Sequence, residues 1–184
     1  MSSASERRAK QTVRNLVFSM LATLGVVALI VLGVPRDDSS LIQKIDYLSV
    51  ASEAESSLAK DVLAPTIPPT WWSNAARIEK QLGLDVWYVG FVTESSQFIA
   101  LSQAFDSNPS WEADVLAGNA MTSTREIAGL TWEIYPTRTP ADPPSTKELA
   151  MLYRGESWTV VIYGTAAETD FAILAEAIAM QLGN

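Results

Sequence analysis

A single uncharged, apolar stretch constrains this chain more than any other feature of its sequence. The 19 residues 16–34, which begin with Leu16 and end with Val34, read LVFSMLATLGVVALIVLGV and contain no Asp, Glu, Lys or Arg. At about 1.5 Å of rise per residue, a helix of this length reaches roughly 28 Å, close to the hydrocarbon thickness of a bilayer. We therefore predict a transmembrane helix over residues 16–34, with the lipid bilayer as its partner.

The charges around this stretch predict its orientation. Four cations precede it against a single carboxylate, whereas the whole chain has a formal net charge of −8. Because Lys and Arg beside an apolar span stay in the cytoplasm, we predict a cytoplasmic tail over residues 1–15 and an acidic extracytoplasmic part in a single-pass protein of the cell membrane. A cleaved signal peptide is the alternative. A retained anchor is favoured because the apolar run is long and no Ala-x-Ala site follows it.

Small residues form a stripe along the predicted helix. Ser19, Ala22 and Gly25 fall on one side of it at about 100° per residue. Such stripes let two helices approach closely, so these residues are candidate contacts with a membrane-protein partner. Small residues are common in apolar spans and no strict GxxxG is present, which makes chance the stronger interpretation.

The chain contains no cysteine and no histidine. Without cysteine it has no disulfides, thiolate nucleophiles or zinc–thiolate sites. Without histidine it lacks the commonest general base and metal ligand, so any catalysis would depend on carboxylates, Lys or Tyr. The acidic balance argues against nucleic-acid binding, which needs a cationic face. We expect no enzyme activity, no cofactor and no metal site.

The sequence changes character twice after the apolar stretch. Residues 35–67 mix apolar and charged residues, carry capping-box patterns at Ser40 and Ser52, and end in prolines, so we predict a partly helical connector. Residues 68–184 are predicted to form one extracytoplasmic domain. Aromatic and branched residues alternate there at period two, which is typical of strands.

Six strands and two helices are predicted in this domain. The first two strands form a hairpin around residues 94–95, an Asn-Pro pair at 108–109 opens the first helix, and a capping box at 165–168 opens the second. The predicted strands are residues 85–93, 96–105, 124–127, 130–135, 148–154 and 157–163. Two meanders, each followed by a helix, indicate an α+β fold in which an antiparallel sheet of about six strands is packed by two helices.

Several short motifs from Pro68 onward carry a resemblance. They are Pro68 with Trp72, Asn74, Ala76 and Arg77; Gly129 with Trp132; residues 153–155; and Trp158 with Val160, Val161 and Gly164. With these motifs the chain resembles a family of actinobacterial single-pass membrane proteins of unknown function. The resemblance implies one N-terminal span, a Pro-Trp start of the domain, hairpins and a terminal helix, and it supplies no catalytic residues. A Gly usually precedes that Trp in the family, whereas Trp71 stands here.

Two kinds of pattern suggest catalysis but have simpler explanations. Ser57 and Lys60 form the S-x-x-K of penicillin-binding enzymes, but no K-T-G or S-D-N accompanies them, so chance is favoured. Acidic pairs could serve glycoside chemistry or a cation, although such pairs are more often solvated helix starts. These pairs are Asp37 with Asp38, Glu53 with Glu55, and Glu112 with Asp114.

The six tryptophans are a richer signal. Trp87, Trp132 and Trp158 fall on alternating strand positions, where a large ring is predicted to fill the core. Two further tryptophans are adjacent in an extended segment and therefore point to opposite faces, so that if one is buried the other is exposed or contacts a partner. The candidate partner contacts in the domain are Trp71, Trp72 and Arg77.

These observations leave three functions. The favoured one is a membrane-anchored extracytoplasmic interaction module, an accessory subunit of a larger cell-envelope or respiratory membrane complex. The second is a carrier or sensor of a lipid or glycan, held in a pocket between the sheet and its helices. The third, ranked last, is a hydrolase that uses carboxylates alone.

Overall fold

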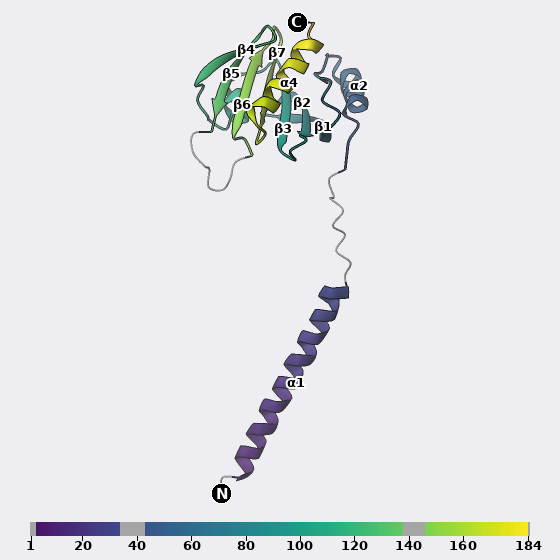
Figure 1. The fold of residues 1–184 in the computed structure, drawn as a ribbon, viewed down its shortest axis with the longest axis vertical. Helices are drawn as coiled ribbons and strands as arrows, with labels where there is room; N and C mark the ends of the chain where they lie inside the picture. Colours follow the sequence, from purple (N-terminus) through teal and green to yellow (C-terminus); the bar gives the residue numbers. More distant parts are fainter. Residues whose placement is uncertain (1–2, 34–42, 138–145, 184) are drawn as a thin grey trace. The chain divides into compact units, whose positions relative to one another are not determined.

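The computed structural model describes residues 3–33, 43–137 and 146–183, and the chain divides into two compact units, Met1–Leu41 and Ile42–Asn184. The described residues form four helices and seven strands (Figure 1). In chain order these are α1 (Ser3–Gly33), α2 (Tyr47–Leu58), β1 (Trp72–Gln81), β2 (Leu84–Val92), β3 (Phe98–Phe105), α3 (Pro109–Val115), β4 (Ser123–Ile127), β5 (Leu130–Pro136), β6 (Leu149–Arg154), β7 (Trp158–Gly164) and α4 (Glu168–Gln181).

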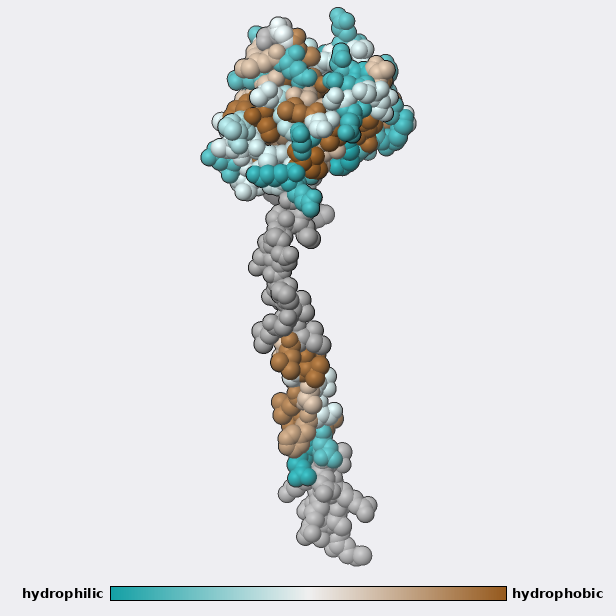
Figure 2. Space-filling model, turned by 90° about the vertical axis from the view of Figure 1, so that its right-hand side faces the viewer, coloured by the Kyte–Doolittle hydropathy of each residue, from teal (hydrophilic) through white to brown (hydrophobic). Residues whose placement is uncertain are grey.

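The first unit contains α1, whose residues 14–29 are all exposed. Their large apolar side chains are brown in Figure 2. Within the described part of the chain, no helix combines the length and the apolar character needed to cross a membrane. The prediction of a transmembrane helix over residues 16–34 is therefore wrong. The uncharged run occupies only the second half of α1, and its last residue, Val34, lies outside the described residues.

The second unit is built on one antiparallel sheet. Its strand order is β1-β2-β3-β7-β6-β5-β4, so the sheet consists of two meanders joined where β3 pairs with β7. This pairing runs from Ile99 opposite Gly164 to Phe105 opposite Trp158. The predictions of an antiparallel sheet and of hairpins are confirmed. The predicted count of about six strands packed by two helices is wrong, because the described residues contain β1 and α2 in addition.

The sequence of strand β1 gives little indication that this segment forms a strand. It reads WSNAARIEKQ, with charged residues at Arg77, Glu79 and Lys80 and few of the branched or aromatic residues that favour strands. It lies at one edge of the sheet, where it pairs only with β2 along its length and Ile45 bridges to Ser73 at its start. An edge position tolerates this polar composition, since charged side chains protect an exposed edge from further pairing.

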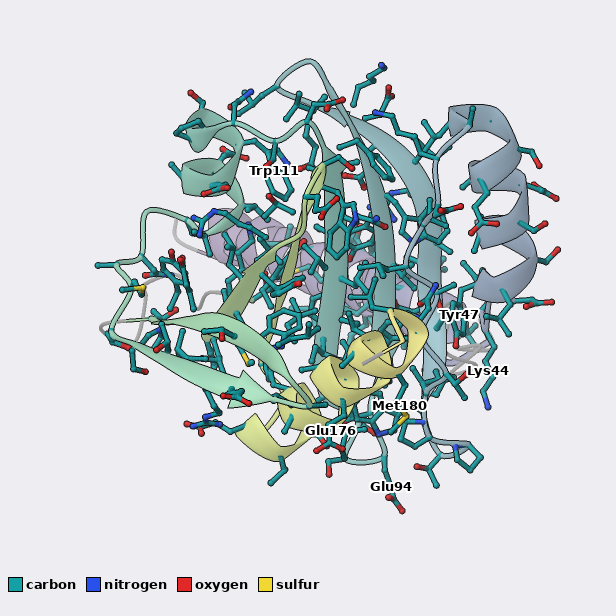
Figure 3. The ribbon with its side chains drawn as sticks, turned by 90° about the horizontal axis from the view of Figure 1, so that it is seen from above. Lys44, Tyr47, Glu94, Trp111, Glu176 and Met180 are labelled. Atoms are coloured by element: carbon teal, nitrogen blue, oxygen red, sulfur yellow. The ribbon has the colours of Figure 1, made fainter. Side chains whose placement is uncertain are left out.

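The two faces of the sheet carry two separate cores. On one face, α2, α4 and the largest apolar cluster pack together, with Trp87, Trp132 and Phe171 fully buried. On the other face, α3 covers a smaller cluster around Trp111, which Figure 3 shows between α3 and the strands. Successive side chains of a strand point to opposite faces of the sheet, so alternate residues pack against the helices of different faces.

Two hairpins turn through residues in the left-handed region. Leu82 and Gly83 connect β1 and β2 with φ of 49° and 84°, and Ala128 and Gly129 connect β4 and β5 with φ of 47° and 81°. Two-residue turns with both φ values positive match the twist of the flanking strands. Glycine adopts this region without strain, whereas the Leu and Ala before it do not.

The helix starts confirm one predicted cap and correct two others. Asn108 caps α3 as predicted, because its side chain accepts a hydrogen bond from the Trp111 N–H. Helix α2 begins at an Asp46 cap, so Ser52 lies inside the helix; Ser40, the other predicted cap, lies outside the described residues. Helix α4 has no side-chain cap, since the Thr165 hydroxyl accepts instead from the Phe98 N–H at 3.3 Å.

Candidate functional site

An extended segment, residues 61–65, crosses the end of the sheet after α2 and is held there by side chains. The Gln103 amide binds it from β3: its Oε1 accepts from the Leu63 N–H at 2.7 Å and its Nε2 donates to the Asp61 carbonyl at 3.2 Å. The Trp87 indole N–H donates to the Leu63 carbonyl at 2.9 Å. Buried side-chain groups thus satisfy the backbone of this segment in place of a neighbouring strand.

The same segment is also held from the helices. Gln181 of α4 accepts from the Ala64 N–H at 2.9 Å and donates to the Val62 carbonyl at 3.1 Å. The Tyr47 hydroxyl of α2 donates to the Pro65 carbonyl at 2.7 Å. Because elements from both ends of the domain converge on residues 61–65, the position of this segment depends on the completed fold.

Two surface pockets lie beside this segment and share Asp61 and Trp158. The first has a volume of about 370 Å³ and the second of about 380 Å³. We call them together the Trp158 groove. The first pocket is lined by Lys60, Asp61, Phe105, Asp106, Ser157 and Trp158, and the second by Glu55, Asp61, Val62, Leu63, Gln103, Trp158, Gln181 and Leu182.

The half-buried Trp158 ring forms the common wall of the groove, and its neighbours fix it there. A Cβ atom on Gly155 would lie 2.7 Å from Trp158 Cε2, so only glycine leaves room for the indole. On the inner side the ring lies 5.8 Å from Tyr153, which in turn lies 5.7 Å from the buried Trp132. Aromatic packing of this kind holds the indole in one orientation.

Left-handed residues place the charged groups of the first pocket. Ala59, with φ of 52°, ends α2 and directs the chain toward Lys60. Asp106, with φ of 54°, follows β3 directly. As a result the Lys60 Nζ lies 3.0 Å from Asp106 Oδ2 and 4.9 Å from the centre of the Phe105 ring.

This arrangement is suited to binding rather than to catalysis. The two carboxylates that line the first pocket do not form an acid–base pair, because Asp106 is ion-paired with the Lys60 ammonium. Among residues with a described position, no three acidic side chains come together as a metal site. What the groove offers is an aromatic face and carboxylates, which are groups that orient a ligand.

A second polar cluster lies on the opposite face of the sheet and has a structural role. Arg154 binds Glu112 of α3 through two hydrogen bonds of 3.1 and 2.7 Å and Glu133 of β5 through one of 2.6 Å. The Tyr135 hydroxyl donates to the other Glu133 oxygen at 2.6 Å. These bonds fasten α3 to the sheet.

The contacts in this cluster shift the pKa values of Glu133, Tyr135 and Arg154. Burial raises the pKa of Glu133, but the hydrogen bonds from Tyr135 and Arg154 outweigh it and bring the pKa below the ordinary value. Burial and the adjacent carboxylate raise the pKa of Tyr135 to about 12. The hydrogen bonds to Glu112 above all raise the pKa of Arg154.

The partner-contact residues predicted in the domain do not gather into one site. Trp71 is buried in the main core and Trp72 is half-buried, with the Lys44 Nζ 5.9 Å from its ring, so the two adjacent rings differ in exposure. Arg77 is exposed on β1, where it pairs with Glu79 and lies 4.3 Å from the Tyr88 ring.

The other predicted candidates are spread over both units. Ser19, Ala22 and Gly25 are exposed on α1 in the first unit. Ser57 lines a small pocket between α2 and β1, while its S-x-x-K partner Lys60 is paired with Asp106. Among the acidic pairs, Asp37 and Asp38 lie outside the described residues, Glu53 and Glu55 are exposed on α2, and Glu112 is bound to Arg154.

Sequence reasoning did not locate the groove. It favoured the core for Trp158, and the partly buried ring does pack against the main core, but it also lines the groove. Asp61 and Asp106 were not considered. One signal was present: the resemblance motif joins Gly155 to Trp158, and a glycine so close to a tryptophan indicates a ring that needs space. The pairing of β3 with β7, which brings Phe105 to Trp158, has no local signal.

Comparisons with known proteins identify a family without a described activity. The chain matches the family described as "Protein of unknown function (DUF4245)" over residues 8–178. That description names neither an enzyme activity nor a cofactor. No curated protein and no solved structure matches the chain.

Proposed function

We propose that this chain, which belongs to the DUF4245 family of proteins of unknown function, is a non-catalytic interaction module that binds a partner protein in the Trp158 groove. In this proposal it is an accessory subunit of a larger complex of the cell envelope. The observation that carries the proposal is the groove, where two pockets of about 370 and 380 Å³ meet at one half-exposed indole. Tryptophan is enriched among the residues that dominate binding energy at protein interfaces.

The rigidity of the groove supports this function. Residues 61–65 are fixed by Gln103, Gln181 and Trp87, and Gly155 leaves the indole a defined place. A preorganised surface loses little conformational entropy when a partner binds, so more of its contact energy appears as affinity.

We further propose that the domain works outside the cytoplasm, at the envelope of an actinobacterium. The cations before the apolar stretch support export of the acidic domain that lies after it in the chain, and the motif resemblance supports the source. The proposal does not include a membrane-spanning helix. A protease added to intact spheroplasts is expected to digest the domain, and full protection of the domain in cells that secrete a control protein would contradict this location.

Glycan binding is the second candidate function. A partly exposed indole bordered by carboxylates, as found in the Trp158 groove, is also able to hold a sugar ring against its face. A lipid chain fits less well, because charged and polar side chains make up most of the lining of the first pocket.

Site-specific crosslinking tests the proposed function. A photoreactive amino acid replaces Ser157, which is exposed and lines the groove, and in a control replaces Ser123, which is exposed on β4. In cells of the source organism we expect a protein adduct of defined mass from position 157 that is absent from position 123. The adduct should disappear in the Trp158→Ala variant.

A second variant keeps this test decisive if Trp158→Ala does not fold. Asp61→Asn changes an exposed carboxylate of the groove and leaves the core intact, so it should reduce the same adduct while circular dichroism stays unchanged. Equal adducts from positions 157 and 123, or no protein adduct from 157, would refute the proposal. Binding of sugar oligomers without any protein adduct would favour the second candidate.

A further inference from the structure

The first pocket of the Trp158 groove already holds a cation, which the chain itself provides. The Lys60 ammonium lies 3.0 Å from Asp106 Oδ2 and 4.9 Å from the centre of the Phe105 ring. A cation between a carboxylate and an aromatic face is stabilised by both groups. Lys60 therefore shows which kind of chemical group this pocket accepts.

Another cation can take the place of Lys60 beside Asp106. The side chains of Lys60 and Asp106 are 43% and 78% exposed, so water screens the ion pair and leaves it weak. Lys60 has a long, flexible stem and can leave Asp106 without any movement of the backbone of residues 61–65, which buried hydrogen bonds hold in place.

The remaining charge of the groove is negative. Three carboxylates, Glu55, Asp61 and Asp106, line the two pockets against the single ammonium of Lys60. Among the described residues, no ion pair involves the Asp61 carboxylate, and Asp61 lies where the two pockets meet. Trp158 lines both pockets together with Asp61, and indole is the aromatic side chain that attracts cations best.

We infer that the Trp158 groove binds a basic segment of a partner protein, with an Arg or Lys side chain lying between Asp61 and Trp158 and competing with Lys60 for Asp106. This inference rests on the proposed function and names the chemistry of the partner. The argument for it is charge complementarity. The lining has an excess of carboxylates, and the only ammonium among its described residues is that of Lys60, whose side chain can move away from Asp106.

Binding of defined peptides to the full chain tests the inference. The probe is a peptide of alternating arginine and glycine, and its control has citrulline, which is nearly identical in shape but uncharged, at each arginine. We expect the arginine peptide to bind about tenfold more tightly than the citrulline peptide, as the loss of a cation–π contact and an ion pair predicts. Isothermal titration calorimetry and quenching of tryptophan fluorescence both report the binding.

Matched variants distinguish binding in the groove from general attraction of the cationic peptide by the negative charge of the protein. Lys60→Gln removes the competing cation and should raise the affinity for the arginine peptide several-fold. Lys80→Gln removes the same charge from an exposed pair with Asp85 outside the groove and should leave the affinity unchanged. Asp61→Asn should weaken binding about threefold, as expected for the loss of one exposed ion pair, whereas Asp85→Asn should not.

The outcomes distinguish this inference from the function on which it rests. If the citrulline peptide binds as well as the arginine peptide, or if Lys60→Gln binds no more tightly than Lys80→Gln, the inference is overturned. A trimer of N-acetylglucosamine, which carries no charge, that binds where the arginine peptide does not would also overturn it. If position 157 forms a crosslink but the arginine peptide does not bind, the proposed function stands and only this inference is overturned. If there is neither a crosslink nor binding of the arginine peptide, both the proposed function and this inference are overturned.

Discussion

At the scale of single residues, the amide of Gln103 forms hydrogen bonds to the backbone of residues 61–65 of the kind that a neighbouring strand would otherwise form. It is almost fully buried, 1% exposed, and it satisfies both the Leu63 N–H and the Asp61 carbonyl. A buried backbone group without a partner costs more than an ordinary hydrogen bond contributes, because it has lost water without replacement. The wall of the Trp158 groove thus depends on one polar side chain in the core.

We expect Gln103→Leu to lower the free energy of unfolding by about 1–3 kcal/mol, since it leaves the two backbone groups of residues 61–65 without a partner. Urea denaturation followed by tryptophan fluorescence measures the change. Gln97→Leu is the matched control, because Gln97 is exposed in the loop before β3 and its replacement should change stability by less than about 0.5 kcal/mol. Equal stability of the two variants would show that the Gln103 amide does not hold the segment.

At the scale of elements, the turns show where local sequence and tertiary structure disagree. Leu82 is 60% exposed and has φ of 49° at a turn position where Asn or Asp is preferred. A leucine in the left-handed region is strained by contact of its Cβ with the backbone. The strand pairing on both sides, from Gln81 opposite Leu84 onward, imposes this conformation.

We expect Leu82→Asn to raise the free energy of unfolding by about 0.5–1 kcal/mol, because Asn adopts positive φ with less strain. Thermal unfolding should show a higher Tm. Ser95→Asn makes the same residue at an exposed loop position that does not have a positive φ, so it should leave the Tm unchanged. A Tm of Leu82→Asn at or below that of the parent would argue against strain in this turn.

Elements with strong local signals could be predicted from the sequence. The hairpin of β2 and β3 follows from alternating apolar residues, and α3 follows from Asn108 and Pro109. Strand β1 was missed because its charged residues suit an edge, and the α4 start was misplaced because Thr165 binds Phe98 of another strand rather than its own helix. The Trp158 groove was missed for a related reason: its residues come from α2, β3 and β7, which only the completed sheet brings together.

At the scale of the whole molecule, buried tyrosines link stability to alkaline pH. Burial is the largest cause of the raised pKa of Tyr47, Tyr88, Tyr135 and Tyr163, and it brings Tyr88 and Tyr135 to about 12. In the unfolded chain these hydroxyls lose their protons near the ordinary value of 10.0. The folded state holds the protons more tightly. The stabilisation that results is therefore complete below pH 10 and is lost as the pH rises through the pKa values of the tyrosines in the folded state.

We therefore expect the contribution of these tyrosines to the free energy of unfolding to be constant from neutral pH to about 10 and to fall between about 10 and 12. Urea denaturation across this range measures the fall, and tyrosinate absorbance should rise together with unfolding. Tyr88→Phe and Tyr135→Phe should each make the fall less steep, because each removes one of the protons involved. An unfolding free energy that stays flat to pH 12, or tyrosinate that forms fully in the folded state near pH 10, would contradict the expectation.

The order of strands has a consequence for how the chain matures. The meander β1–β2–β3 comes early in the domain, but its inner edge is covered only by β7, which follows β4, β5 and β6 in the chain. Because pairing between distant segments slows folding, a chain that is being synthesised cannot close its sheet until β7 has been made. Until then β3 keeps an unpaired apolar edge, which exposes the nascent chain to aggregation and makes it a natural client of chaperones.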